Sequence, residues 1–229
     1  MNISRPIVLI ALLVATCTAQ AQLQPATLGD PEAERYFLKH IGFPETQGDA
    51  SVTISCLAIV KGSGRLKDTQ CFIKDNWDPD FAQSIEQAAK KAELSPAHMD
   101  DKTRTVGILF QVVFLKKGDD RSITLLLNPG MEEMVEAYGK GHISAQRVMG
   151  KEDWGKKCPK HAKWLVYAQS HVDESGVASS VELGHGSGII PTGPCQQAII
   201  DTTTSSEFAP AMVDGVAVPS VYIEPFGGG

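Results

Sequence analysis

The sequence predicts an α+β fold made of two small units in tandem, on three observations. A short motif at 95–101 (SPAHMDD) recurs at 209–215 (APAMVDG), 114 residues later. Each occurrence follows two strand-like segments joined by a glycine-containing turn, and a further strand-like segment comes after it. An amphipathic helix precedes the motif in the first unit. A shared order of elements is typical of internal duplication, so we interpret the chain as two diverged copies of one unit.

The first unit is expected at 50–127. Its strands are expected at Val52–Val60, Arg65–Ile73, Thr105–Leu115 and Ser122–Leu127. Asp78 is suited to cap the helix and Pro79 to its first turn, and Pro96 is expected to stop it. The apolar residues of this helix share one face: Phe81, Ile85, Ala88, Ala89 and Ala92.

The second unit is expected at 160–226 and repeats this order. Its strands are expected at Trp164–Val172, Val177–Leu183 and Val216–Phe226. Gly176 in its hairpin turn takes the place of Gly64. A helix is expected to begin at Pro194, although the β-branched and polar run Thr202–Ser206 has weak helix propensity.

Three segments lie outside the two units. The N-terminal segment 22–49 is expected to contain a helix at Asp30–His40. The linker 128–159 is expected to hold a helix around Met131–Tyr138, followed by charged residues. The last residues, 227–229, are expected to form a flexible tail.

Residues 1–21 have the features of a cleavable export signal. Arg5 precedes an apolar stretch at 6–18, which is about a dozen residues long and shorter than a membrane-spanning helix. Small residues in Ala19-Gln20-Ala21 then form a signal-peptidase pattern. We therefore expect a periplasmic protein with no stable membrane insertion after cleavage. The alternatives are a lipid anchor on Cys17 and an uncleaved anchor.

Loss of the signal would remove one of the five cysteines and leave an even set. An even set in an exported protein predicts two disulfides, because the compartment is oxidising. A zinc site is disfavoured, since the sequence has no C-x-x-C pair. Three pairings are possible among the four remaining cysteines, which are Cys56, Cys71, Cys158 and Cys195.

No pattern of residues predicts catalysis, a metal or a cofactor. The formal net charge of −6 does not favour nucleic-acid binding. Gly184–Gly188 lacks the glycine pattern of a nucleophile elbow and is expected to be a flexible loop. Segment 62–65 is a turn without the phosphate-loop lysine, and the acidic run 75–80 lacks the glycine and glutamate of an EF-hand. The histidines have no metal-ligand spacing: His40, His98, His142, His161, His171 and His185.

Two stretches resemble the C-terminal domain of the TonB family. One is 206–218 (SEFAPAMVDGVAV), which is similar to the family pattern f-x-P-A-x-x-d-G-x-x-V. The other is Cys56–Cys71, Cys-x7-Gly-x-Leu-x4-Cys, which resembles the first hairpin of a TonB-like subgroup with a cysteine on each strand. The first copy departs from the pattern at Asp101, where glycine is usual. The resemblance covers about residues 50–117 and 160–226.

The resemblance implies that each unit is an antiparallel sheet of about three strands with a helix packed across it. It also implies a binding role, because TonB domains pair a sheet edge with a strand of an outer-membrane receptor. Residues 22–50 lack a long proline-rich span, so energy transduction is not expected. We expect a non-enzymatic protein that binds a peptide or protein partner of the cell envelope by strand addition. The candidate edges are Ser122–Leu127 and Val216–Ile223. The alternatives are a TonB-like transport component retained at the membrane and an enzyme with a site between the units.

The resemblance also orders the cysteines. It implies a Cys56–Cys71 bond, which a two-residue turn at Ser63-Gly64 would bring about by placing the two residues opposite each other. The equivalent positions in the second unit are Ala168 and Leu183, so this bond would be specific to the first unit. The remaining pair, Cys158–Cys195, would join the linker to the start of the second helix.

Overall fold

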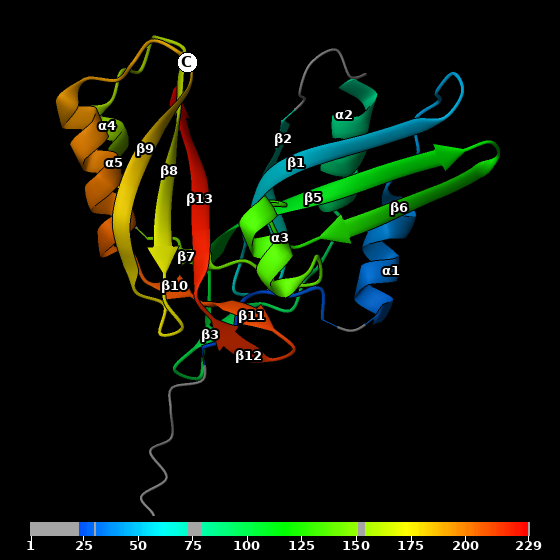
Figure 1. The fold of residues 1–229 in the computed structure, drawn as a ribbon, viewed down its shortest axis with the longest axis horizontal. Coiled ribbons are helices and arrows are strands. Elements are labelled where there is room, and N and C mark those ends of the chain that lie inside the picture. Colours follow the sequence, from blue (N-terminus) through cyan, green and yellow to red (C-terminus); the bar gives the residue numbers. More distant parts are fainter. Residues whose placement is uncertain (1–22, 30, 73–78, 151–153, 229) are drawn as a thin grey trace, which may run out of the picture.

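The computed structural model describes residues 23–29, 31–72, 79–150 and 154–228 (Figure 1). The expected export signal, including Cys17, lies outside these residues, as do Asp78 and most of the acidic run at 75–80. The described part forms five helices and four sheets, and every strand pair is antiparallel. The α+β class predicted from the sequence is confirmed.

In the larger sheet, β1 (Ala50–Val60) lies between β2 (Leu66–Phe72) and β5 (Val106–Lys117). Strand β6 (Asp120–Leu126) follows β5 through a tight turn and pairs with it. Alternate residues of β1 and β5 are buried, because successive side chains of a strand point to opposite faces. Two helices pack on the buried face, α1 (Pro31–His40) and α2 (Pro79–Ala89).

The smaller sheet has the same strand order. Strand β8 (Trp164–Val172) lies between β9 (Ala178–Gly188) and β13 (Ser220–Gly228), as β1 lies between β2 and β5 (Figure 1). Helix α5 (Gly193–Ser205) packs against β8 and β9. A short hairpin precedes the third strand of each sheet in chain order; the hairpins are β3 (Ala97–Met99) with β4 (Lys102–Arg104), and β11 (Ala211–Val213) with β12 (Val216–Val218).

The first hairpin has a longer loop than the expected two-residue turn at Ser63-Gly64. The Lys61 N–H donates to the Arg65 carbonyl at 3.0 Å, which leaves three residues in the loop. An additional residue in β2, Asp68 at φ +50°, then forms a bulge. The bulge restores the register, so the Cys56–Cys71 pair is still directly opposed.

The second hairpin has the same construction. The Asp173 N–H donates to the Val177 carbonyl at 3.1 Å, again across a three-residue loop. Ser180, at φ +53°, occupies the bulge in β9. Ala168 consequently faces Leu183, at the positions that align with the cysteines of the first hairpin.

Helix α5 continues through the polar stretch that was expected to weaken it. Pro194 lies in the first turn, as expected. The hydroxyls of Thr203 and Ser205 donate to the carbonyl oxygens four residues earlier, at 3.0 and 2.6 Å. These bonds hold the hydroxyls against the helix. The hydroxyls therefore do not compete for other backbone groups, and the helix does not end early.

Helix α2 ends at Ala89, before the position expected from Pro96. Ala92 is buried beyond the helix end. The Leu94 N–H donates to the Gly64 carbonyl at 2.9 Å, so the chain leaves the helical path to pair with the hairpin loop.

Four further segments differ from their expected structures. Gly184–Gly188 belongs to β9 and is not a loop, and β13 continues through Gly227 and Gly228 rather than ending in a tail. Pro219 divides the expected strand Val216–Phe226, and with it the candidate edge Val216–Ile223, between β12 and β13. The range 128–159 contains the expected helix, α3 (Glu132–Tyr138), and also two elements that the sequence pattern did not predict, β7 (Gln146–Val148) and α4 (Trp154–Lys157).

Strand β7 joins the two halves of the molecule. It pairs with the start of β5 on one side and with β10 (Phe208–Ala209) on the other. The Gln146 side chain also bonds both backbone groups of Ala26, with N···O distances of 2.7 Å. The larger sheet therefore includes residues from the second half of the chain.

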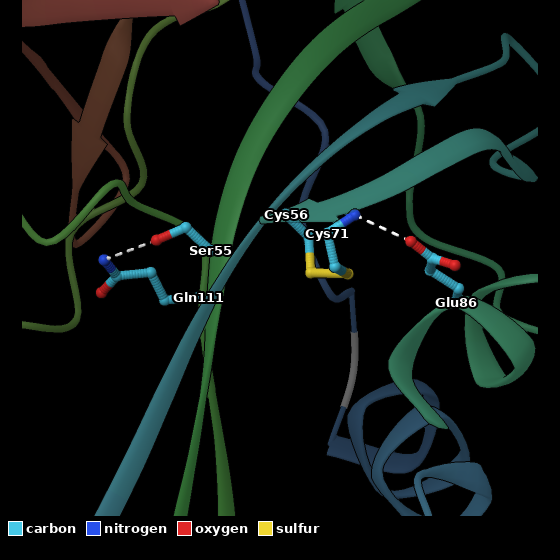
Figure 2. The surroundings of a disulfide bond; sticks show 5 residues. All are labelled: Ser55, Cys56, Cys71, Glu86 and Gln111. Carbon is cyan, nitrogen blue, oxygen red and sulfur yellow. Dashed lines mark hydrogen bonds between the residues drawn. A yellow bond between two sulfur atoms is a disulfide. The ribbon is translucent and has the colours of Figure 1, made fainter. Parts of the chain in front are cut away.

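Both cysteine pairs form disulfides. Cys56–Cys71 links β1 to β2, and the Cys71 N–H donates to Glu86 on α2 at 2.9 Å (Figure 2). Cys158–Cys195 links the segment after α4 to the first turn of α5. Two disulfides indicate an oxidising, exported environment. In the described part of the chain, no helix is long and apolar enough to cross a membrane.

The hairpin glycines are expected to be required for a close backbone approach. Gly176 has φ +80°, and a Cβ there would collide with the Phe208 carbonyl oxygen. We predict that Gly176→Ala lowers the free energy of unfolding by roughly 2 kcal/mol or more, measured by urea denaturation. Gly118→Ala is the matched control, because Gly118 also has positive φ but faces open space. Equal losses in the two variants would contradict the role of the close approach.

Candidate functional site

Strand β13 is an open sheet edge. Among the described strands, it pairs with β8 alone. The Val221 N–H points away from β8 and donates to the Met134 sulfur at 3.4 Å. Backbone groups alternate in direction along a strand, so those of Ile223, Pro225 and Gly227 also point away from β8. This edge lies within the region that the sequence predicted for strand addition.

A groove runs between this edge and the larger sheet. It has a volume of about 330 Å³ and lies where β13 stands beside the larger sheet in Figure 1. We call it the interunit groove and define it by the residues that line it: Leu57, Gln70, Phe72, Trp164, Leu165, Pro225, Gly227 and Gly228. None of these described residues carries a charge, and the exposed surface of the groove is more polar than apolar.

Helix α3 closes one end of the β13 edge through Met134. None of its residues is fully buried, and glycines with positive φ flank it, Gly130 at +67° and Gly139 at +79°. Gln111 on β5 donates to the Pro129 carbonyl at 2.8 Å and so fixes the turn that leads into the helix. The helix therefore rests on the surface and is positioned mainly by its ends.

A second cavity, of about 670 Å³, lies against the outer face of the larger sheet and α3. Ser51, Thr53 and Val113 form part of its floor, and Glu132, Glu136 and Lys140 line its rim. This cavity is lined by charged residues, whereas the interunit groove is not. The two cavities thus offer different surfaces to a ligand.

A buried ion pair holds β7 against β13. Arg147 donates to both carboxylate oxygens of Glu224, at 2.6 Å each, and the two residues are 1% and 5% exposed. The Tyr222 hydroxyl donates to Glu224 at 2.8 Å. Burial raises the pKa of the Tyr222 hydroxyl well above its usual value, and the Glu224 carboxylate adds to the rise. Arg147 also lies over the Phe226 ring at 5.9 Å.

Sequence reasoning did not identify this ion pair. A signal for it was available, because Glu224 alternates with Tyr222 and Phe226 on the inward face of a strand. A charged residue at an inward position predicts a buried partner. The partner itself was not predictable, because β7 was not expected as a strand.

The other predicted edge, Ser122–Leu127, corresponds to β6 and the residue after it. Among the described strands, β6 pairs with β5 alone, so its outer side is also open, although the Leu127 carbonyl just beyond it accepts from the Ser144 N–H at 3.0 Å. It lies on the far side of the larger sheet from β2 and is separate from the interunit groove (Figure 1).

The remaining candidates do not come together as a site. The Gly62–Arg65 segment is part of the hairpin loop, and Gly184–Gly188 lies in β9. His142 is buried, with its Nδ1 2.8 Å from the Gly139 carbonyl. Across the residues that the structure describes, no three His, Cys, Asp or Glu side chains gather as a metal site would require.

The fold and the cysteines place the chain among disulfide-bonded α+β proteins with an open sheet edge beside a groove. Comparisons with protein-family models, with curated proteins and with solved structures find no match for it. The resemblance to the TonB C-terminal domain therefore stays a prediction.

Proposed function

We propose that this chain is an exported, non-enzymatic binding protein that takes up an extended segment of a peptide or protein partner along β13. The observation that carries this proposal is the unpaired edge of β13, which faces the interunit groove. The expected descent of both halves from TonB-like units supports it, since such domains bind by strand addition. A periplasmic location, with the partner in the cell envelope, belongs to the same proposal.

The backbone of β13 defines what the partner must offer. Ile223 and Gly227 each present an outward N–H, whereas Pro225 between them has none. All three present outward carbonyls. The partner strand therefore needs carbonyls opposite Ile223 and Gly227 and can donate N–H groups along the whole stretch.

The walls of the groove define the side chains of the partner. Leu57 and Phe72 on one wall and Leu165 on the other are apolar. A charged side chain in this groove would lose hydration without gaining a partner charge. We therefore expect the bound segment to be extended and uncharged over the residues that enter the groove.

A phage-displayed random peptide library selected on the wild-type protein tests this proposal. We predict enrichment of uncharged sequences, and a loss of affinity of roughly tenfold or more in Ile223→Pro, measured by fluorescence anisotropy. Proline at 223 removes an outward N–H and leaves the ladder to β8 intact. Ile123→Pro on β6 is the matched control and should bind the same peptides normally. Peptides that bind Ile223→Pro as well as wild type would contradict the proposal.

A further inference from the structure

Strand β6 differs from the other described edge strands of seven or more residues, β2, β9 and β13. Strand β2 carries a bulge at Asp68, β9 carries one at Ser180, and β13 contains Pro225 and is touched by Met134. Bulges, prolines and covering groups are the devices by which sheet edges avoid pairing with other chains. Strand β6 has no bulge in its register with β5 and no proline over its seven residues. It is the described edge best suited to accept another strand.

The outward groups of β6 follow from its turn. Lys117 and Asp120 flank the two-residue turn and form a directly bonded pair. Backbone direction alternates from there, so the outward N–H and carbonyl groups belong to Arg121, Ile123 and Leu125. The Arg121 side chain is held on the core face of the sheet, 5.4 Å from the Phe43 ring.

We propose that β6 pairs antiparallel with β6 of a second copy of this chain, with the two-fold axis at Ile123. This register places Arg121 opposite Leu125 of the second copy, and Ile123 opposite itself. All outward groups are then satisfied, by about six hydrogen bonds across the axis. The dimer would extend the larger sheet continuously from one copy into the other.

The side chains of β6 favour this register. Ser122 would face Thr124 of the second copy on the outer face, and Asp120 would face Leu126, so no like charges meet. An axis at Arg121 would instead oppose two arginines, which is destabilising. The proposal is independent of peptide binding in the interunit groove, because it uses a different edge.

Charge exchange at Ser122 and Thr124 tests the proposal. Both side chains are exposed, so substitutions there leave the core intact. We expect wild type to sediment as a dimer, and S122K/T124K and S122E/T124E each to dimerise roughly tenfold or more weakly. An equimolar mixture of the two variants should restore the dimer, because Lys and Glu then face each other. Native mass spectrometry distinguishes this mixed dimer by its mass.

Two proline variants separate this dimer from groove binding. Ile123→Pro should be monomeric and folded by circular dichroism, whereas Ile223→Pro should dimerise as wild type does. A monomeric wild type at every concentration reached would overturn the proposal. So would dimers of either charge variant as strong as wild type, since they would place the interface elsewhere.

Discussion

Arg147→Met is expected to lower the free energy of unfolding by about 3–5 kcal/mol, the usual result of removing one partner of a buried ion pair. The substitution would leave the Glu224 carboxylate 5% exposed and without its bidentate donor. The Tyr222 hydroxyl would be its only remaining donor among the interactions described above. One neutral hydrogen bond does not replace a paired charge.

The double variant R147M/E224L is the control, because it removes both charges and keeps apolar volume. Apolar replacement of a buried pair is often neutral or stabilising, so we expect the double variant to recover most of the loss. Urea denaturation of wild type, both single variants and the double variant gives the four free energies of unfolding that a double-mutant cycle requires. If R147M lowered the free energy of unfolding by less than about 1 kcal/mol, the expectation would be wrong and the pair would be hydrated in solution.

This ion pair also bears on the interunit groove. Arg147 lies on β7, which belongs to the larger sheet, and Glu224 lies on β13, which forms one side of the groove. The pair therefore fixes β13 relative to the larger sheet. Peptide affinity should fall in R147M even at temperatures where the variant remains folded.

The order of elements could be predicted from the sequence, because turns and alternating strands leave local patterns. The recurring Pro-Ala motif and the glycines at 64 and 176 correctly placed both hairpins and the strands that follow. The bulges were not predicted, because Asp68 and Ser180 lie inside β2 and β9 and the local sequence does not mark an additional residue there. Their positive φ is imposed by the three-residue loops and by the register of the neighbouring strand.

The segment between the halves was the least predictable part. Strand β7 has three residues, too few for a period to be visible, and its pairing with β5 and β10 is entirely long-range. The groove depends on this pairing. The open edge of β13 was predicted in part. The break at Pro219 is local, because proline cannot donate to a strand ladder, whereas the Met134 contact comes from tertiary packing.

The two disulfides are expected to differ in their contributions to stability. Cys158–Cys195 spans 37 residues and Cys56–Cys71 spans 15. In the chain-entropy description, these separations correspond to about 4 and about 3 kcal/mol. The core around Cys158–Cys195 is also much smaller, since it contains seven buried residues, whereas the cluster around Cys56 contains many more.

We therefore predict that C158A/C195A is destabilised more than C56A/C71A, and that its smaller sheet unfolds first. Trp154 and Trp164 pack in the cluster around Cys158–Cys195, where their rings are 6.2 Å apart. The third tryptophan of the sequence, Trp77, is replaced by Phe in every variant of this comparison, so that tryptophan fluorescence reports on that region. In C158A/C195A, the fluorescence transition in urea should precede the far-ultraviolet circular dichroism transition. In C56A/C71A, the larger sheet loses its cross-strand link but keeps its extensive core, so the fluorescence transition should not come first. Coincident transitions in C158A/C195A would contradict this prediction. They would mean that β7 and the Arg147–Glu224 pair couple the two sheets into one cooperative unit, so that the whole molecule shares the lost stability.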